Sequence, residues 1–184
     1  MTVQNYIDRA AHRNLFLIGF MGTGKSTIAA ELSKLLFRDV LEMDETIEKR
    51  EGMSIPGIFS TYGEPYFREL ETSLLKEIGE SGNYIISCGG GVAMRKENVE
   101  EMRKSGRIIL LTAKPETILL RVLDDESRPL LKGHKNTNDI AALIHSRRPA
   151  YEAAADYVVA TDDKSVEEIT EEILNILEKE GISK

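Results

Sequence analysis

The sequence predicts an α/β protein with a doubly wound, five-stranded parallel sheet and helices on both of its faces. Five short apolar runs recur along the chain, and stretches with helical spacing of apolar residues separate them. Strands that alternate with helices form parallel sheets whose two faces are both covered. The five runs are Leu15 to Ile18, Val40-Leu41, Tyr84 to Ser87, Ile108 to Leu111 and Tyr157 to Val159.

The helices are predicted from apolar periodicity and from signals at their ends. Behind the first run, the apolar residues from Ile28 to Leu36 repeat at helical spacing. Pro115 stands where a first-turn proline is tolerated, and Ser165 with Glu168 three residues later forms a capping-box pattern. The expected helices span about Lys25 to Phe37, Glu64 to Ser81, Lys96 to Ser105, Pro115 to Leu123, Asp139 to Ala154 and Ser165 to Glu180.

Length and composition bound the class of protein. A chain of 184 residues suits one domain, with residues 1–13 as an N-terminal extension. The net charge of −7, from 24 basic and 31 acidic residues, disfavours a broad nucleic-acid surface. The one cysteine has no partner within the chain, and no apolar stretch approaches the ~20 residues of a membrane span. We expect a cytoplasmic monomer that binds neither nucleic acid nor membrane.

A glycine-rich loop follows the first apolar run. Residues 19 to 26 read G-F-M-G-T-G-K-S, which fits the phosphate-loop pattern G-x-x-x-x-G-K-S between a strand and a helix. Its glycines let backbone N–H groups close around an anion, and the positive end of the helix dipole points at the same place. Lys25 can reach the outer phosphates and Ser26 can ligate Mg²⁺. The pattern therefore predicts nucleoside triphosphate binding rather than a plain turn.

Two acids follow the second apolar run. Glu42 and Asp44 stand at the carboxyl end of this expected strand, where ligands collect in open α/β sheets. One carboxylate can hold Mg²⁺ through water, and the other can orient or deprotonate an attacking hydroxyl. The alternative is structural, with Asp44 as the N-cap of the following helix and Glu42 solvated.

Three consecutive glycines follow the third run, again at the carboxyl end of an expected strand. Gly89-Gly90-Gly91 would let the backbone approach a ligand closely and donate N–H groups to it. A flexible turn explains the same residues.

Arginines are the candidate anion ligands, because a guanidinium grips a carboxylate or phosphate with two parallel hydrogen bonds. Arg68 and Arg147 stand in expected helices, and Arg128 stands in an irregular polar stretch from Asp124 to Thr137. A loop of that length in a compact domain is usually functional or disordered. We interpret residues 124–137 as a mobile lid.

Taken together, these segments resemble the shikimate kinases, a family of small phosphate-loop kinases in the nucleoside monophosphate kinase-like group. The resemblance extends from about Asn14 to Glu180. It depends on the joint order of G-x-x-G-x-G-K-S at 19 to 26, acid-x-Asp at 42 to 44, Ser54-Ile55 through Ile58-Phe59, Gly63-Glu64, Phe67-Arg68-x-x-Glu71, Gly89 to Gly91, Arg128-Pro129-Leu130-Leu131 and Arg147-x-Pro149-x-Tyr151.

The resemblance implies a kinase that uses ATP and Mg²⁺ to phosphorylate the 3-hydroxyl of shikimate, in the chorismate pathway to aromatic amino acids. A lid would close over ATP. The implied catalytic residues are Lys25, Asp44 and Arg128. Implied ATP-binding residues are Gly22, Thr23, Gly24, Lys25, Ser26, Thr27, Arg121 and Arg128. Implied substrate-binding residues are Asp44, Phe59, Phe67, Arg68, Gly89, Gly90, Gly91 and Arg147.

One position departs from the family pattern, which usually has Asp-x-Asp where this chain has Glu42-Met43-Asp44. Glu42 and Ser26 are the expected metal contacts, with Glu42 acting through water. Two rival functions remain open at this point. One is another small-metabolite kinase, such as a gluconate kinase, and the other is a nucleotide-binding module that has lost catalysis.

Overall fold

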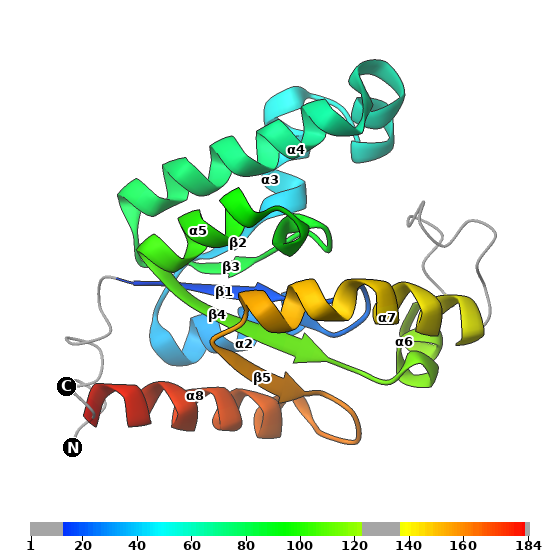
Figure 1. Cartoon of the computed structure of the whole chain (residues 1–184). Helices are drawn as coiled ribbons and strands as arrows, with labels where there is room; N and C mark the ends of the chain where they lie inside the picture. Colours follow the sequence, from blue (N-terminus) through cyan, green and yellow to red (C-terminus); the bar gives the residue numbers. More distant parts are fainter. Residues whose placement is uncertain (1–12, 123–136, 183–184) are drawn as a thin grey trace.

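The five predicted strands form one parallel sheet in the order β2-β3-β1-β4-β5. The computed structural model describes residues 13–122 and 137–182. Every neighbouring pair of strands runs parallel, so the predicted doubly wound architecture is confirmed (Figure 1). The strands are β1 (Asn14–Ile18), β2 (Val40–Glu42), β3 (Ile85–Ser87), β4 (Gly106–Thr112) and β5 (Tyr157–Ala160).

Apolar residues fill both faces of the sheet because successive side chains of a strand point in opposite directions. In β1, Leu15 and Leu17 pack on one face, whereas Phe16 and Ile18 pack on the other. The first face is covered by α2 (Lys25–Leu36) and α8 (Val166–Ile182), and the second mainly by α4 (Ile55–Ser81), α5 (Lys96–Ser105) and α7 (Thr137–Ala154) (Figure 1). The chain therefore builds two apolar cores, one on each side of the sheet.

Two of the predicted helix starts are confirmed by the structure. Pro115 is the first residue of α6 (Pro115–Val122). At the start of α8, the Glu168 N–H donates to Ser165 Oγ and the Ser165 N–H donates to Glu168 Oε2, at 3.2 and 2.7 Å. This is the reciprocal pair of a capping box.

Neither helix α3 nor the first part of helix α4 is among the helices expected from the sequence. Helix α3 (Met43–Glu51) buries only Met43 and Ile47, so its polar sequence lacks a clear apolar period. Helix α4 begins at Ile55 rather than at Glu64, and Gly63, with φ 84° and ψ 165°, interrupts its helical backbone. The predicted start at Glu64 therefore marks this kink, which a glycine adopts without the strain of a Cβ.

The strand order determines which loops meet at the carboxyl edge of the sheet. β1 pairs with both β3 and β4, and β2 pairs with β3. The loops that leave β1, β2 and β3 therefore start side by side at this edge, where α/β proteins bind ligands. Among the described helices, no stretch combines the length and the apolar character that crossing a bilayer requires. The proposed extension lies outside the described residues except for Arg13, and the proposed lid except for Thr137.

Two glycine-to-alanine substitutions should change stability in opposite directions. A Cβ atom on Gly106 would lie 2.2 Å from the Asn14 carbonyl oxygen of the neighbouring strand, so Gly106→Ala should lower the free energy of unfolding by about 1 to 3 kcal/mol. Gly79 lies within α4, and its Cβ would meet only Ser105 at 3.6 Å. Gly79→Ala should raise the free energy of unfolding by about 0.4 to 1 kcal/mol.

Urea unfolding of both variants measures these two changes. Equal effects of the two substitutions would contradict the strand contact at Gly106.

Candidate active site

The loop between β1 and α2 leaves its backbone amides available to an anion. Gly24 is the N-cap of α2, with φ 95°, and no side chain caps the amides of the first helical turn. Gly19 has φ 142°, and a Cβ there would lie 2.3 Å from the Leu111 carbonyl oxygen. The glycines at both positions are therefore needed for the backbone course, and the amide-rich helix start suits a phosphate.

Side chains of the loop and of α6 hold this phosphate loop in shape. The buried Thr23 hydroxyl donates to the Phe20 carbonyl at 2.8 Å. Lys25 Nζ donates to the carbonyls of Gly19 and Phe20, at 2.9 and 3.1 Å, so the ammonium is held against the first residues of the loop. From α6, Arg121 Nη1 donates to the Gly22 carbonyl at 3.2 Å and to Thr161 Oγ1 at 3.0 Å. The predicted ATP-binding residues Gly22 to Thr27 and Arg121 are therefore gathered in one place.

Ser26 and Glu42, the predicted metal contacts, both stand at the carboxyl edge of the sheet. Ser26 is exposed in the first turn of α2, and its Oγ lies 3.3 Å from Ser87 Oγ at the end of β3. Glu42 ends β2, the strand beside β3. In the described residues, no group of three or more His, Cys, Asp or Glu side chains could hold a metal by itself. Because protein-bound Mg²⁺ usually keeps several waters and binds substrate phosphates, this sparse donor set fits it.

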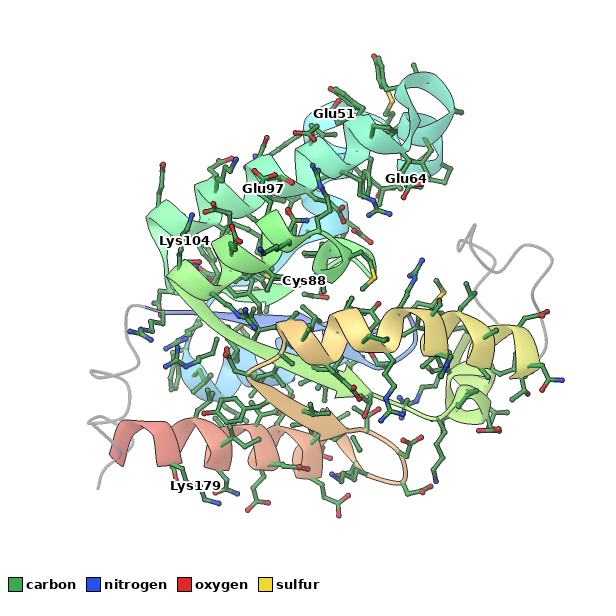
Figure 2. All side chains as sticks on the ribbon, in the orientation of Figure 1. Glu51, Glu64, Cys88, Glu97, Lys104 and Lys179 are labelled. Carbon is green, nitrogen blue, oxygen red and sulfur yellow. The ribbon has the colours of Figure 1, made fainter. Side chains whose placement is uncertain are left out.

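Each of the three consecutive glycines after β3 faces a different group of side chains. A Cβ on Gly89 would lie 2.6 Å from Asp44 Oδ1 and 3.1 Å from Glu71 Oε1. A Cβ on Gly91 would lie 2.4 Å from Arg68 Nη1, and a Cβ on Gly90 would lie 3.9 Å from Arg147 Nη1. The loop Gly89–Gly91, hereafter the glycine loop, is therefore packed against charged groups and is not a plain flexible turn. Figure 2 labels Cys88, the buried residue that precedes it.

Arg68 is held in α4 by two carboxylates. Its Nη1 donates to Glu71 Oε2 at 2.8 Å, while Nε and Nη2 donate to Glu64 Oε1 at 3.1 and 2.7 Å. A guanidinium carries five N–H donors, so two of them remain beyond these three bonds. The Arg68 guanidinium also lies 5.3 Å from the centroid of the Phe67 ring, a cation–π distance. Arg68 is thus oriented by its own helix and still has donors for a further anion.

Two carboxyl groups beside the glycine loop have perturbed pKa values. Burial raises the pKa of Glu71, and the adjacent Arg68 guanidinium opposes part of this rise. Partial desolvation raises the pKa of Asp44, against the opposing effect of the Lys25 ammonium. Glu71 Oε1 is buried and accepts no hydrogen bond within the described part of the chain. Such an atom next to Asp44 is a natural acceptor for a hydroxyl of a bound ligand or for a water molecule.

Helix α7 brings a second arginine to the glycine loop. Tyr151 is buried, and its hydroxyl donates to the Gly90 carbonyl at 2.5 Å. Arg147, one turn earlier, places its guanidinium 5.7 Å from the centroid of the Phe20 ring in the phosphate loop. On the α4 side, the rings of Phe59 and Phe67 meet edge to face with centroids 5.0 Å apart. Helices α4 and α7 therefore place arginines and aromatic rings around the glycine loop.

The structure brings together the described candidate residues from six segments of the chain. The segments are the phosphate loop, the end of β2 with α3, the first half of α4, the glycine loop, α6 and α7. The alternative in which Asp44 is the N-cap of α3 is wrong, because the N-cap of this helix is Glu42. The Glu42 side chain makes no capping hydrogen bond. Arg128 lies outside the described residues.

Sequence reasoning assigned no role to Glu71 or Tyr151. The spacing of three residues between Arg68 and Glu71 could have indicated an ion pair on one face of a helix. No local signal connects Tyr151 to Gly90, because 61 residues separate them in the sequence.

Comparison with known proteins agrees with this geometry. The family model for shikimate kinase matches residues 21–178. A shikimate kinase of Caldanaerobacter subterraneus is 39% identical over 162 residues, which cover 88% of this chain and 94% of that protein. The structure of shikimate kinase from Acinetobacter baumannii in complex with shikimate superposes with a TM-score of 0.87 at 30% identity, covering 95% of this chain and 98% of that one. The structure of shikimate kinase from Aquifex aeolicus superposes with a TM-score of 0.79 at 39% identity, and the match covers 93% of this chain and 99% of that one.

A gluconokinase from Sinorhizobium meliloti has the same fold but is only 15% identical, with a TM-score of 0.59 over 91% of this chain and 92% of that one. The matched family is one of small phosphate-loop kinases, and membership of a kinase family implies ATP as the nucleotide substrate. Within that class, the sequence match is specific. The chain belongs to the shikimate kinase family.

The raised pKa of Glu71 predicts a particular pH dependence of stability. Between the ordinary glutamate pKa of 4.5 and the higher native value, the unfolded chain has lost a proton that the native protein keeps. The free energy of unfolding contributed by Glu71 therefore falls as pH rises through this window. The difference in unfolding free energy, wild type minus Glu71→Gln, should decrease as pH rises above 4.5 and then level off. Urea unfolding at a series of pH values measures it, and a difference that increases with pH would refute this assignment.

Proposed function

We propose that this protein transfers the γ-phosphoryl group of ATP to the 3-hydroxyl of shikimate, giving shikimate 3-phosphate and ADP. One observation carries the proposal beyond family membership: Arg68 and Arg147 flank the glycine loop directly beside the phosphate loop. The chain has a net charge of −7, so an anionic acceptor requires local cations of this kind. Shikimate carries one carboxylate and several hydroxyls, which match these arginines and the neighbouring carboxylates.

The phosphate loop binds ATP. Its amides and the α2 N-terminus hold the phosphate oxygens, and Lys25 stabilises the negative charge on the transferring group. Mg²⁺, when bound, would neutralise part of the charge on the phosphates. Ser26 would ligate the ion directly, and Glu42 would contact it through water. Arg121, tied to the Gly22 carbonyl, would contact the adenine.

The acceptor binds between α3, α4, α7 and the glycine loop. Arg68 and Arg147 grip its carboxylate, while Phe59 and Phe67 shape the pocket for its ring. Asp44 accepts a hydrogen bond from the attacking 3-hydroxyl and aligns it, and Gly89, Gly90 and Gly91 let the backbone approach the ring. These roles agree with the crowding of Asp44, Glu71 and Arg68 around the glycine loop.

Catalysis then consists mainly of alignment and charge stabilisation. The 3-hydroxyl oxygen bonds to the γ-phosphorus, the bond from that phosphorus to the bridging oxygen breaks, and ADP leaves with the bonding electrons. Burial raises the pKa of Asp44, which makes its carboxylate a better acceptor for the hydroxyl proton, and the Lys25 ammonium opposes part of this rise. Arg128 and the lid of residues 124–137 remain predictions, as does a monomeric state.

An acceptor screen tests the proposed function. ADP release with ATP and Mg²⁺ should require shikimate, and neither gluconate nor nucleoside monophosphates should replace it. Turnover with gluconate instead would favour the rival metabolite kinase. ATP binding without ADP release for any acceptor would favour a module that has lost catalysis.

Two adjacent arginines on α7 form a matched pair of test substitutions. Arg147→Ala should weaken shikimate binding by about 2 to 5 kcal/mol, the usual cost of removing one side of a desolvated charge pair. ATP binding should change little. Arg148 is exposed and pairs with Glu152 on its own helix, so Arg148→Ala should leave both affinities unchanged. Calorimetric titration of each variant measures the two affinities, and equal losses in the two variants would contradict the assigned role of Arg147.

A further inference from the structure

A buried chain of hydrogen bonds connects α4 to the segment that follows the glycine loop. Thr72 and Asn98 are 3% and 0% exposed, and both are polar. Thr72 Oγ1 lies 2.7 Å from Asn98 Oδ1, and Asn98 Nδ2 donates to the Val92 carbonyl at 3.1 Å. Burying these groups is unfavourable unless they are paired, so their mutual hydrogen bonds define one arrangement of this region.

The direction of these bonds can be worked out atom by atom. Because the Asn98 amide nitrogen donates to a carbonyl, its oxygen is left to accept from the Thr72 hydroxyl. That hydroxyl has a single proton, and Asn98 Oδ1 is nearer to it than the Arg68 carbonyl at 3.0 Å. Arg95 Nη1 donates to Thr72 Oγ1 at 3.2 Å. The chain therefore runs from Arg95 through Thr72 and Asn98 to the Val92 carbonyl.

Two members of this chain, Thr72 and Val92, stand next to residues of the acceptor site. Thr72 follows Glu71 and lies one helical turn after Arg68 on α4. Val92 follows Gly91 and begins the short helix η1 (Val92–Met94), and its N–H donates to the Gly89 carbonyl at 3.1 Å. Any movement of Val92 would thus move the glycine loop relative to Arg68, whose Nη1 is only 2.4 Å from the Cβ position of Gly91.

We propose that Thr72 and Asn98 are positioning residues that fix the glycine loop against Arg68 and so set the geometry of the acceptor site. Neither side chain needs to touch the acceptor. The proposal depends on the proposed function, because it concerns the affinity for shikimate. Its prediction is a specific loss of shikimate affinity when the hydroxyl of Thr72 is removed.

The test compares variants that differ in one atom group. Thr72→Val keeps the shape and removes the hydroxyl, so KM for shikimate should rise about tenfold, the effect of losing one buried hydrogen bond, while KM for ATP stays within about twofold. Thr72→Ser keeps the hydroxyl and should restore the shikimate KM. Asn98→Ala breaks the same chain from α5 and should give the same pattern as Thr72→Val.

Two control variants separate positioning from general destabilisation. Thr170 is equally buried, and its hydroxyl bonds to carbonyls of its own helix α8 on the other side of the sheet. Thr170→Val should lower the melting temperature without raising the shikimate KM. Lys104, labelled in Figure 2, pairs with Glu101 at 2.8 Å on the surface of α5. Lys104→Gln should leave both KM values unchanged.

The outcomes distinguish the two proposals. If wild type does not phosphorylate shikimate, the proposed function fails. If wild type does and Thr72→Val and Asn98→Ala retain its shikimate KM, the positioning proposal alone is overturned. Parallel increases of both KM values, or failure of Thr72→Ser to restore the shikimate KM, would also overturn it.

Discussion

The close packing of the glycine loop is the constraint on which the rest of the site depends. Cβ atoms at Gly89 and Gly91 would collide with Asp44 and Arg68, and one at Gly90 would reach van der Waals contact with Arg147. Side chains at Gly89 and Gly91 would therefore displace the Asp44 carboxylate and the Arg68 guanidinium from their positions against the loop. This absence of side chains lets α3, α4 and α7 deliver their charged groups to one point beside the phosphate loop.

The cost of burying charge explains why Arg68 is paired with a carboxylate beside the glycine loop. The Arg68 guanidinium is partly buried, and Glu71 beneath it is 1% exposed, so neither charge could be desolvated alone at low cost. The ion pair holds Arg68 in position, and two of the five guanidinium N–H groups remain to bind the phosphoryl acceptor. The same burial raises the pKa of Glu71. The orientation of Arg68 and the perturbed pKa of Glu71 therefore both result from burying this ion pair.

Much of this architecture could be predicted from the sequence because the signals were local. Apolar runs fixed the five strands, and the spacing of glycines, Lys25 and Ser26 fixed the phosphate loop. Helix α3 was missed because its buried residues are only Met43 and Ile47. The links from Thr72 to Asn98 and from Tyr151 to Gly90 join residues 26 and 61 positions apart, so only the folded packing reveals them.

The central claim is that the arginines beside the glycine loop read the carboxylate of the acceptor. Calorimetric titration of shikimate and of its uncharged carboxamide into wild type and Arg147→Ala tests this claim most directly. The account predicts that wild type binds shikimate much more tightly than the carboxamide and that Arg147→Ala removes most of this difference. If the carboxamide lost as much affinity as shikimate on mutation, Arg147 would not be reading the carboxylate, and the account of acceptor recognition would be contradicted.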